Sequence, residues 1–559
     1  MIGVIAKPSQ LEAVEEFFQL FKTPWEFYRP EAAYSVVLAT ADVACLNCNL
    51  LLLFGSERKS IDRDLGIAPG RRSDSVVSEW RDTPLPIYTG VCNLSPSGNA
   101  FVTAGGEAIG VRIQHGRSTV IRLGYDLFEE VSWLLMNSQP LEHAHTPALD
   151  LHIDLIRSSI LSAGLPLMEI PPAPAGHPFA ACLTHDIDFV GIRPHKFDHT
   201  MFGFLYRATV GVVSNVLRGR LSVRRLLDAW CAVAKLPFVY LGWVEDFWEP
   251  FEWYLKAEEG LPATYFLIPF KRRAGEAVAV PHVSRRATAY DVTDIRSSMA
   301  RLREHGCEIG VHGIDSWHSI ERGRAELGRV AETARQSSTG IRMHWLLQDG
   351  STASVLEEAG YAYDSTAGYN ETIGYHNGTG QVFRPLGART LLELPMHIQD
   401  GALFFPGQMN LSADEAEQRC RCFIENAVRF GGVLTLLWHD RSHAPERFWG
   451  DFYLRLLEQV RAPKPWFGSA AQVVDWFRKR RDVSFERIDI SDGFSSHLQY
   501  EGVEIKPPLC VRMYRSGRGT PGEAVSDFVD IPWNGMSLEG LERQLPSFFA
   551  NAVANPIIS

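Results

Sequence analysis

The stretch ACLTHDIDFVG, from Ala181 to Gly191, decides how the rest of this chain is interpreted. An apolar run ends abruptly there, and two aspartates follow, Asp186 and Asp188, separated by a single residue. On an extended strand, residues two apart point to the same side, so the two carboxylates would share one face. The pair either forms a turn or caps a helix, or it sits where one carboxylate can hold a cation and the other a proton.

Short apolar runs recur along the chain from Phe179 onward, and helical stretches separate them. Such an alternation predicts an α/β fold with a parallel sheet, either open or closed into a barrel. The runs are FAACL, ATYFLI, EIGV, GIRM, LLELPM and GGVLTLLW, and the helical stretches include DIRSSMARLREHG, ERGRAELGRVAETARQ, SADEAEQRCRCFIENAVRFG and ERFWGDFYLRLLEQVRA.

Residues that can do chemistry follow the C-terminal ends of several of these runs. In parallel α/β folds the loops after the strands meet on one face, and active sites are built there. Each residue alone has an ordinary structural explanation, as a turn former, a helix cap or a buried, hydrogen-bonded histidine. Five run ends that all supply Asp, His or Arg favour a shared site instead. The residues are His185, Asp186 and Asp188; His312, Asp315 and His318; Arg342, within GIRM, and His344 after it; Asp364, after a further short run, GYAY; and His439 and Asp440.

The remaining parts of the chain predict two further regions. Residues 1–165 mix short β-type runs with helical ones, which indicates an N-terminal α/β domain of unknown role. The proline-rich stretch from Pro171 to Gly176 is typical of a linker. We expect the main domain at 177–480, and a small β-rich C-terminal region at 481–559.

Composition excludes some functional classes. The net charge is −11 and no basic face stands out, so nucleic-acid binding is not expected. We find neither a signal-peptide pattern nor an uncharged apolar run of about 18 residues, so we expect no transmembrane segment. Nine scattered cysteines fit reduced thiols, which favours the cytoplasm. The apolar, basic segment from Met201 to Arg220 is either a core helix with a basic end or a peripheral membrane contact.

The motifs LTHDID, EIGVHGIDSWH, RMHW, YDSTAGY and LLWHD occur in the order of the motifs of a known family. The chain from Phe179 to Arg478 resembles the polysaccharide deacetylases, carbohydrate esterase family 4, with their NodB-homology domain. Its first motif is similar to the variant with threonine, histidine and D-x-D, and the helices between Pro194 and Gly260 resemble an insertion. The resemblance implies a distorted (β/α) barrel and a metal-dependent removal of an acetyl group from an N-acetylated sugar.

The resemblance also implies roles for individual residues. Asp186 matches the catalytic base, Arg342 the arginine that orients this base, and His439 the general acid. Asp188 and His312 match metal ligands. One divalent metal ion, Zn²⁺ foremost, suits a set of one carboxylate and two imidazoles, and it leaves positions open for water and substrate.

The third metal ligand is less clearly marked. The family places its second histidine four residues after the first, whereas here His318 follows His312 by six. Gly313 allows a break in the chain after His312, so we predict His318 as the third ligand, with Asp315 and His344 as substitutes.

The substrate side is predicted from an aromatic loop and a strand end. The loop after Asp364 carries Tyr369 and Tyr375, which either stack on sugar rings or anchor a surface loop. Trp438 also ends an apolar run, and it either contacts substrate or packs in the core. We expect an acetylated sugar or glycan precursor of surface polysaccharide, linked to a nucleotide or to a lipid.

Two other functions stay open at this point. A D-x-D pair at a strand end also holds the metal-bound nucleotide diphosphate in many glycosyltransferases, although that use needs neither His312 nor His439. Alternatively, the chain is a non-catalytic deacetylase scaffold that binds glycans. Release of acetate, release of a nucleotide, or binding without turnover distinguishes the three.

Overall fold

The computed structural model describes residues 1–43, 47–81, 83–95, 99–276, 283–490, 493–514 and 528–536. Its chain divides into two compact units. Unit 1 contains residues 1–177, 377–386 and 475–559, and unit 2 contains residues 178–376 and 387–474.

Unit 2 is built on a parallel sheet with strand order β16-β15-β14-β13-β18-β17. Every neighbouring pair in this order is parallel. Parallel bridges from Ile341 to Asp364 and from Asp364 to Glu393 continue the pairing beyond β16, so the sheet curls. A fully closed barrel stays a prediction. The strands are β13 (Ala180–Ile187), β14 (Ala263–Leu267), β15 (Glu308–Gly313), β16 (Ile341–Met343), β17 (Ile398–Gln399) and β18 (Val433–Leu437), and β19 (Trp466–Phe467) also pairs with β13.

The predicted apolar runs become these strands, with one exception. The run Leu391–Met396 supplies only the bridge at Glu393, and the paired strand β17 lies a few residues later. The helices between the strands are α7 (Phe251–Ala257), α8 (Arg296–Glu304), α9 (Ile320–Ala334), α10 (Thr352–Ala359), α11 (Asp400–Phe404), α12 (Ala413–Phe430), α13 (Gly450–Arg461) and α14 (Ala470–Asp482).

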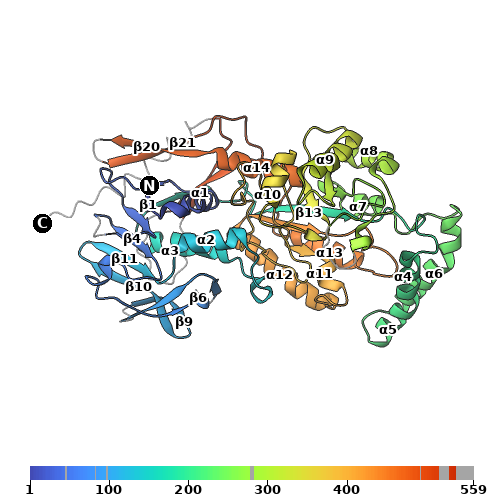
Figure 1. Cartoon of the computed structure of the whole chain (residues 1–559), viewed down its shortest axis with the longest axis horizontal. Helices are drawn as coiled ribbons and strands as arrows, with labels where there is room; N and C mark the ends of the chain where they lie inside the picture. The colour runs from blue at the N-terminus through green and yellow to red at the C-terminus, as the bar shows by residue number, and fades with distance from the viewer. Residues whose placement is uncertain are drawn as a thin grey trace. The chain divides into compact units, whose positions relative to one another are not determined.

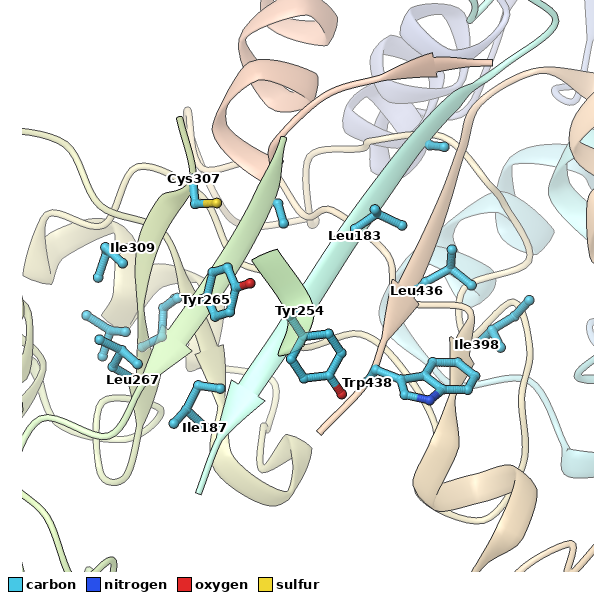
Figure 2. Close-up of a cluster of buried hydrophobic side chains, with 14 of the residues drawn as sticks. Leu183, Ile187, Tyr254, Tyr265, Leu267, Cys307, Ile309, Ile398, Leu436 and Trp438 are labelled. Carbon is cyan, nitrogen blue, oxygen red and sulfur yellow. The ribbon is translucent and has the colours of Figure 1, made fainter. Parts of the chain in front are cut away.

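The hydrophobic core of unit 2 lies on one face of this sheet (Figure 2). Leu183 and Ile187 of β13 belong to it, together with Tyr254 of α7 and Leu436 of β18. Successive side chains of a strand point to opposite faces, so Thr184 and Asp186 are turned away from this core. The strand therefore carries packing residues on one face and polar residues on the other.

An insertion of helices separates β13 from β14, as the sequence predicts. It contains α4 (His199–Tyr206), a π-helical turn (Arg207–Gly211), α5 (Val212–Leu217) and α6 (Val223–Tyr240), followed by α7. Figure 1 shows α4, α5 and α6 in green. The insertion has its own apolar cluster, formed by Ile192, Met201, Phe204, Ala208, Val212, Ala229, Ala232, Leu236, Val239, Trp248 and Ala444.

Unit 1 contains a nine-stranded mixed sheet with order β2-β1-β3-β4-β11-β10-β9-β6-β7. The half from β2 to β11 is parallel, and the half from β11 to β7 is antiparallel. Helices α1 (Leu11–Leu20), α2 (Leu127–Met136) and α3 (Ala148–Ser162) belong to this unit. The strands are β1 (Ile2–Ile5), β2 (Trp25–Phe27), β3 (Val36–Ala39), β4 (Leu50–Phe54), β6 (Val76–Trp80), β7 (Thr83–Ile87), β9 (Asn99–Ala104), β10 (Glu107–His115) and β11 (Ser118–Leu123).

The described residues of the C-terminal region contribute strands to unit 1. Strands β22 (Leu509–Tyr514) and β23 (Phe528–Trp533) extend β12 (Leu167–Glu169) into a three-stranded antiparallel sheet. Strands β20 (Ser484–Ile490) and β21 (Gly493–Gln499) pair with each other, as do β5 (Ala68–Ser73) and β8 (Val91–Ser95).

Within the described ranges, no helix has both the length and the apolar character to cross a bilayer. In the described part of the chain the free thiols include Cys92, Cys182, Cys231, Cys307, Cys420, Cys422 and Cys510, and Cys45 lies outside it.

Candidate metal centre and active site

The C-terminal ends of β13, β15, β16 and β18 surround a cavity of 480 Å³. Its wall contains six of the residues that the sequence places at strand ends: Asp186, Asp188, His312, His344, His439 and Asp440. Because parallel strands present their C-terminal ends at one edge of the sheet, residues as distant in the chain as Asp186 and Asp440 meet here. The wall also includes the aromatic rings of Trp345 and Phe405 and the arginines Arg441 and Arg447.

Three electron-pair donors face one another in this cavity. His312 Nε2 lies 3.6 Å from Asp188 Oδ1 and 2.8 Å from His344 Nδ1, and His344 Nδ1 lies 3.3 Å from Asp188 Oδ1. Ligands of a tetrahedral zinc ion with bonds of about 2.0–2.1 Å are separated by about 3.3 Å. One carboxylate and two imidazoles are thus already spaced for a single divalent cation.

Hydrogen bonding supports this fit. The backbone carbonyl of Arg342 accepts a hydrogen bond from His312 Nδ1 at 3.0 Å, which leaves the lone pair of the neutral ring on Nε2. Asp188 Oδ1 is buried and has no hydrogen-bond partner within the described residues. A buried carboxylate oxygen without a partner is costly, and a bound cation would remove that cost.

Burial lowers the pKa of His344 well below its ordinary value, and the adjacent His312 and Arg286 lower it further. The ring is therefore neutral at physiological pH, which is the form that ligates a metal. It is placed by an unusual turn, in which Trp345 and Leu346 both have left-handed backbone conformations (φ 65° and 54°). Arg286 is buried beside this turn and donates hydrogen bonds to the carbonyls of Ile314 (2.7 Å) and His344 (3.3 Å).

Asp186 is held by a buried arginine. Arg342 Nη1 lies 3.0 Å from Asp186 Oδ1 and 2.8 Å from Thr184 Oγ1, while the rest of its guanidinium donates to the backbone and hydroxyl oxygens of Ser365. Burial alone would raise the pKa of the Asp186 carboxyl, but the nearby His312 and Arg342 outweigh it, so this pKa is lowered. Asp186 is therefore ionised and fixed in orientation.

His439 is paired with Asp400 on the other side of the cavity. Its Nδ1 lies 2.5 Å from Asp400 Oδ1, and its backbone N–H donates to Asp400 Oδ2 at 2.9 Å. Ser442 donates a third hydrogen bond to this carboxylate. Burial lowers the pKa of His439, but the Asp400 carboxylate raises it more strongly, to about 9. The imidazole is therefore protonated at neutral pH, and Nε2 can donate into the cavity that the ring lines.

His318, predicted as the third ligand, is not brought to this group. After β15 the chain turns through Ile314–His318 before α9 begins, so His312 and His318 are not on one helix. The Nε2 atom of His318 lies 3.6 Å from Asp315 Oδ1, and Asp315 pairs with Arg322 as well. His344, named above as a substitute, lies in this group of donors, while Asp315 does not.

The three predicted substrate residues do not line the cavity. Trp438 is fully buried against Phe452 and Tyr453, so of its two interpretations, substrate contact and core packing, the structure shows core packing. Tyr375 is buried and stacks on Phe423 of α12. Tyr369 is also buried.

His185 and Asp364, two further residues predicted at strand ends, form structural contacts. His185 points to the core face, where Nε2 bonds Glu258 at 2.9 Å and the ring packs on Tyr254. Asp364 is buried in the bridge beyond β16, and Thr366 donates a hydrogen bond to its carboxylate.

Several site residues were missed at the sequence level. Asp400 follows a strand of only two residues, and the same rule of strand ends would have found it had β17 been recognised. Asn370 donates to the Trp345 carbonyl at 3.0 Å and lines the cavity. Arg286 contributes by donating hydrogen bonds to backbone carbonyls, and no motif in the sequence identifies it.

No family model matches the sequence, and no match was found among curated proteins. Solved structures with some likeness include the carbohydrate deacetylase Agd3, at 9% identity over 96% of this chain and 97% of that one, with a TM-score of 0.37. A Mycobacterium smegmatis protein assigned as a polysaccharide deacetylase has 18% identity over 57% of this chain and 99% of its own, with a TM-score of 0.34. Puue allantoinase has 14% identity over 55% of this chain and 92% of its own, with a TM-score of 0.33. Since all three scores are below 0.5, these likenesses alone establish neither fold nor function.

Proposed function

We propose that this protein is a metal-dependent hydrolase that removes an acetyl group from an N-acetylated sugar. One observation carries the proposal. A carboxylate and two imidazoles converge at cation-binding distances, in a cavity that an ionised aspartate and a protonated histidine also line. Metal-dependent amide hydrolysis uses these three elements: a cation, a group that accepts a proton and a group that donates one.

Asp188, His312 and His344 would hold the metal. A divalent ion bound there supplies an electrophile for an acyl carbonyl oxygen and acidifies water, and Zn²⁺ fits this donor set best. The finer features stay part of the proposal: a closed barrel for residues 177–480, separate roles for the regions 1–165 and 481–559, and a cytoplasmic location.

Asp186 would accept the proton of the attacking water. Its carboxylate faces the same cavity as the cation ligands, and its Oδ2 lies 3.8 Å from His312 Nε2. Arg342 occupies Oδ1, so Oδ2 is the oxygen left for the water. The ion pair also keeps Asp186 from accepting a proton before water is bound, since it favours the ionised carboxyl.

His439 would protonate the leaving group. As the bond between the acyl carbon and nitrogen breaks, Nε2 donates a proton to the departing amine, and Asp400 stabilises the imidazolium before that transfer. Without this proton an amine anion would have to leave, which is far less favourable. The same arrangement would serve an O-acetyl ester, although an alkoxide is the better leaving group.

A sugar fits the remaining wall of the cavity. Trp345 and Phe405 provide apolar rings, and Asn370, Gln399 and Gln408 provide amide groups that can bond hydroxyls. The volume of 480 Å³ suits a small number of sugar rings. The sugar would be linked to a nucleotide or to a lipid.

Release of acetate tests the proposal. The purified protein is loaded with Zn²⁺ and incubated with an N-acetylated amino-sugar oligomer, and free acetate and new amine are quantified together. Equimolar acetate and amine that vanish with a chelator and return with metal support the proposal. Release of a nucleotide from a sugar nucleotide, or glycan binding with no acetate from loaded protein, would point to the two other functions.

A further inference from the structure

The helical insertion before β14 exposes apolar side chains to an unusual degree. Of the 23 large apolar residues that are exposed in the described chain, twelve lie between residues 197 and 244. That segment is less than a tenth of the protein, so the concentration is not the scatter of single apolar residues normal for a surface. The twelve are Phe197, Phe202, Tyr206, Val210, Leu217, Val223, Leu227, Trp230, Phe238, Leu241, Trp243 and Val244.

The first exposed stripe lies along α4 and α5. Phe202, Tyr206 and Val210 follow one another at intervals of four, and Leu217, with 83% of its surface exposed, lies seven further on. Residues at these spacings share one helix face. The buried side chains of the same helices, such as Phe204, occupy the opposite face.

Helix α6 repeats the pattern. Val223, Leu227, Trp230, Phe238 and Leu241 are exposed at spacings of four, three, eight and three. The buried stripe Ala229, Ala232, Leu236 and Val239 lies about half a turn away. A helix that is apolar on two opposite faces needs two apolar partners, and within the described residues α6 has one.

A groove of 680 Å³ joins the two stripes into one surface. Its walls come from α5 and the preceding turn (Val210, Val213 and Leu217) and from α6 (Trp230), and Arg218 lies at its side. The two stripes therefore belong to one continuous apolar face, which we call the insertion face.

The helices of the insertion that carry these stripes, α4 to α6, are basic, although the protein is acidic. Residues 199–240 contain six Lys or Arg and one Asp, a formal charge of +5, against −11 for the whole chain. Arg218, Arg224 and Lys235 are exposed, and no ion pair holds them within the described residues. Aromatic rings beside solvated cations are the composition of helices that lie in the interface of an anionic bilayer.

We propose that the insertion face docks on the surface of an anionic membrane, with α4, α5 and α6 lying in the plane of the headgroups. Leu217, Leu227 and Trp230 enter the acyl boundary, and Arg218, Arg224 and Lys235 meet lipid phosphates. The positive charge of α4 to α6 favours a lipid surface over a protein partner, because basic side chains beside an apolar face match phosphates above hydrocarbon. This docking does not depend on the proposed chemistry.

A consequence for the substrate does rest on the proposed function. Arg220, just beyond α5, donates a hydrogen bond to Asn410 at 3.3 Å. Phe405 and Gln408, a few residues earlier, line the active-site cavity. The guanidinium of Arg441, which also lines the cavity, packs on Trp248 of the insertion cluster, 4.7 Å from the ring centre. A docked protein would thus hold the cavity close to the bilayer, so the sugar is expected to be carried by a lipid.

Vesicle flotation tests the docking without any substrate. Full-length protein is mixed with vesicles of phosphatidylcholine alone, or with about a third phosphatidylglycerol, and the floated fraction is measured. We expect binding to the anionic vesicles. The variant L217S/L227S/W230S should bind at least about tenfold more weakly, and R218Q/R224Q/K235Q about a hundredfold more weakly, at roughly fivefold per charge.

The control is V428S/L454S, which removes two exposed apolar residues from α12 and α13 of the same unit and should bind like the parent. Circular dichroism and metal content must match the parent for each variant. In the parent itself, brominated lipids should quench the tryptophan fluorescence, because Trp243 has 73% of its surface exposed on the insertion.

Three outcomes would overturn the proposal: no binding of the parent to anionic vesicles, equal binding of both triple variants, or absence of quenching. A parent dimer in light scattering that L217S/L227S/W230S converts to monomer, without vesicle binding, would assign the face to a second copy instead. Acetate release from a water-soluble oligomer should stay unchanged in both triple variants, so a failure of docking and a failure of the hydrolase proposal are distinguishable.

Discussion

Asp400 contacts His439 with both of its carboxylate oxygens. One oxygen lies 2.5 Å from the ring Nδ1, and the other accepts a hydrogen bond from the backbone N–H of His439 at 2.9 Å. The ring can therefore neither rotate nor exchange its partner, and the carboxylate raises its pKa to about 9 although burial opposes this. Protonated His439 is present below that pKa and is lost as the pH rises through it.

Asp400→Asn should move the alkaline limb of the pH profile. Asparagine can still accept the Nδ1 hydrogen bond but carries no charge, so the pKa of His439 falls toward or below the ordinary value of about 6.5. We expect kcat/KM to decline from near pH 9 in the parent and from below about pH 7 in the variant. An alkaline limb that stays near pH 9 would show that His439 is not the acid.

His439→Ala should reduce turnover without loss of metal, because the residue is placed as proton donor and not as ligand. The defect should shrink for acetyl esters of acidic phenols, whose leaving groups need no proton. Rates with an N-acetyl sugar and with such an ester, measured beside metal content, check this. A variant that loses its metal, or equal defects on both substrates, would contradict the assignment.

Asp186→Asn should keep the metal and lose at least about a hundredfold in kcat, since the amide preserves an acceptor for Arg342 but cannot take the proton of water. Metal content and acetate release are measured on the same preparation. Near-normal release would remove Asp186 from the base role.

His344→Ala and His318→Ala form a matched pair for the third ligand. We expect the first to lose most of its bound metal, with an affinity at least about tenfold weaker, because one of three protein ligands is removed. The second should retain metal, since His318 pairs with Asp315 away from the cavity. Metal analysis after dialysis against a weak chelator decides between them, and the reverse result would restore the ligand set predicted from the sequence.

The sequence predicts those residues of the site that directly follow apolar runs. Asp186, Asp188, His312 and His439 each follow an apolar run, and the parallel sheet brings them together because its C-terminal edge is shared. Asp400 is not predicted from the sequence because β17 has only two residues, too few to show the hydrophobic pattern of a strand. The sequence favours His318 over His344 as a ligand because a motif gives the spacing of residues along the chain and not the direction in which their side chains point.

Other features lie beyond local pattern. The left-handed conformations of Trp345 and Leu346 cost about 1–3 kcal/mol each, and bulky side chains give no sign of them in a sequence. Tyr369 and Tyr375 are aromatic residues in a glycine-rich loop, a pattern that fits core anchors and sugar platforms equally well. The exposed stripes of α4, α5 and α6 have the period of an ordinary buried helix, so burial had to be observed before they could be recognised.

The central position of β13 has a consequence for how the molecule reaches its working state. This strand pairs with β14 on one side and with β18 on the other, although β18 comes about 250 residues later in the chain. The metal ligands come from residues 188 to 344, whereas the proton donor arrives only with the last long strand of the sheet. Such distant pairings form late, because long loops must close before any contact stabilises them. During refolding, retention of a metal ion should therefore precede turnover, and acetate release reports completion of the whole unit.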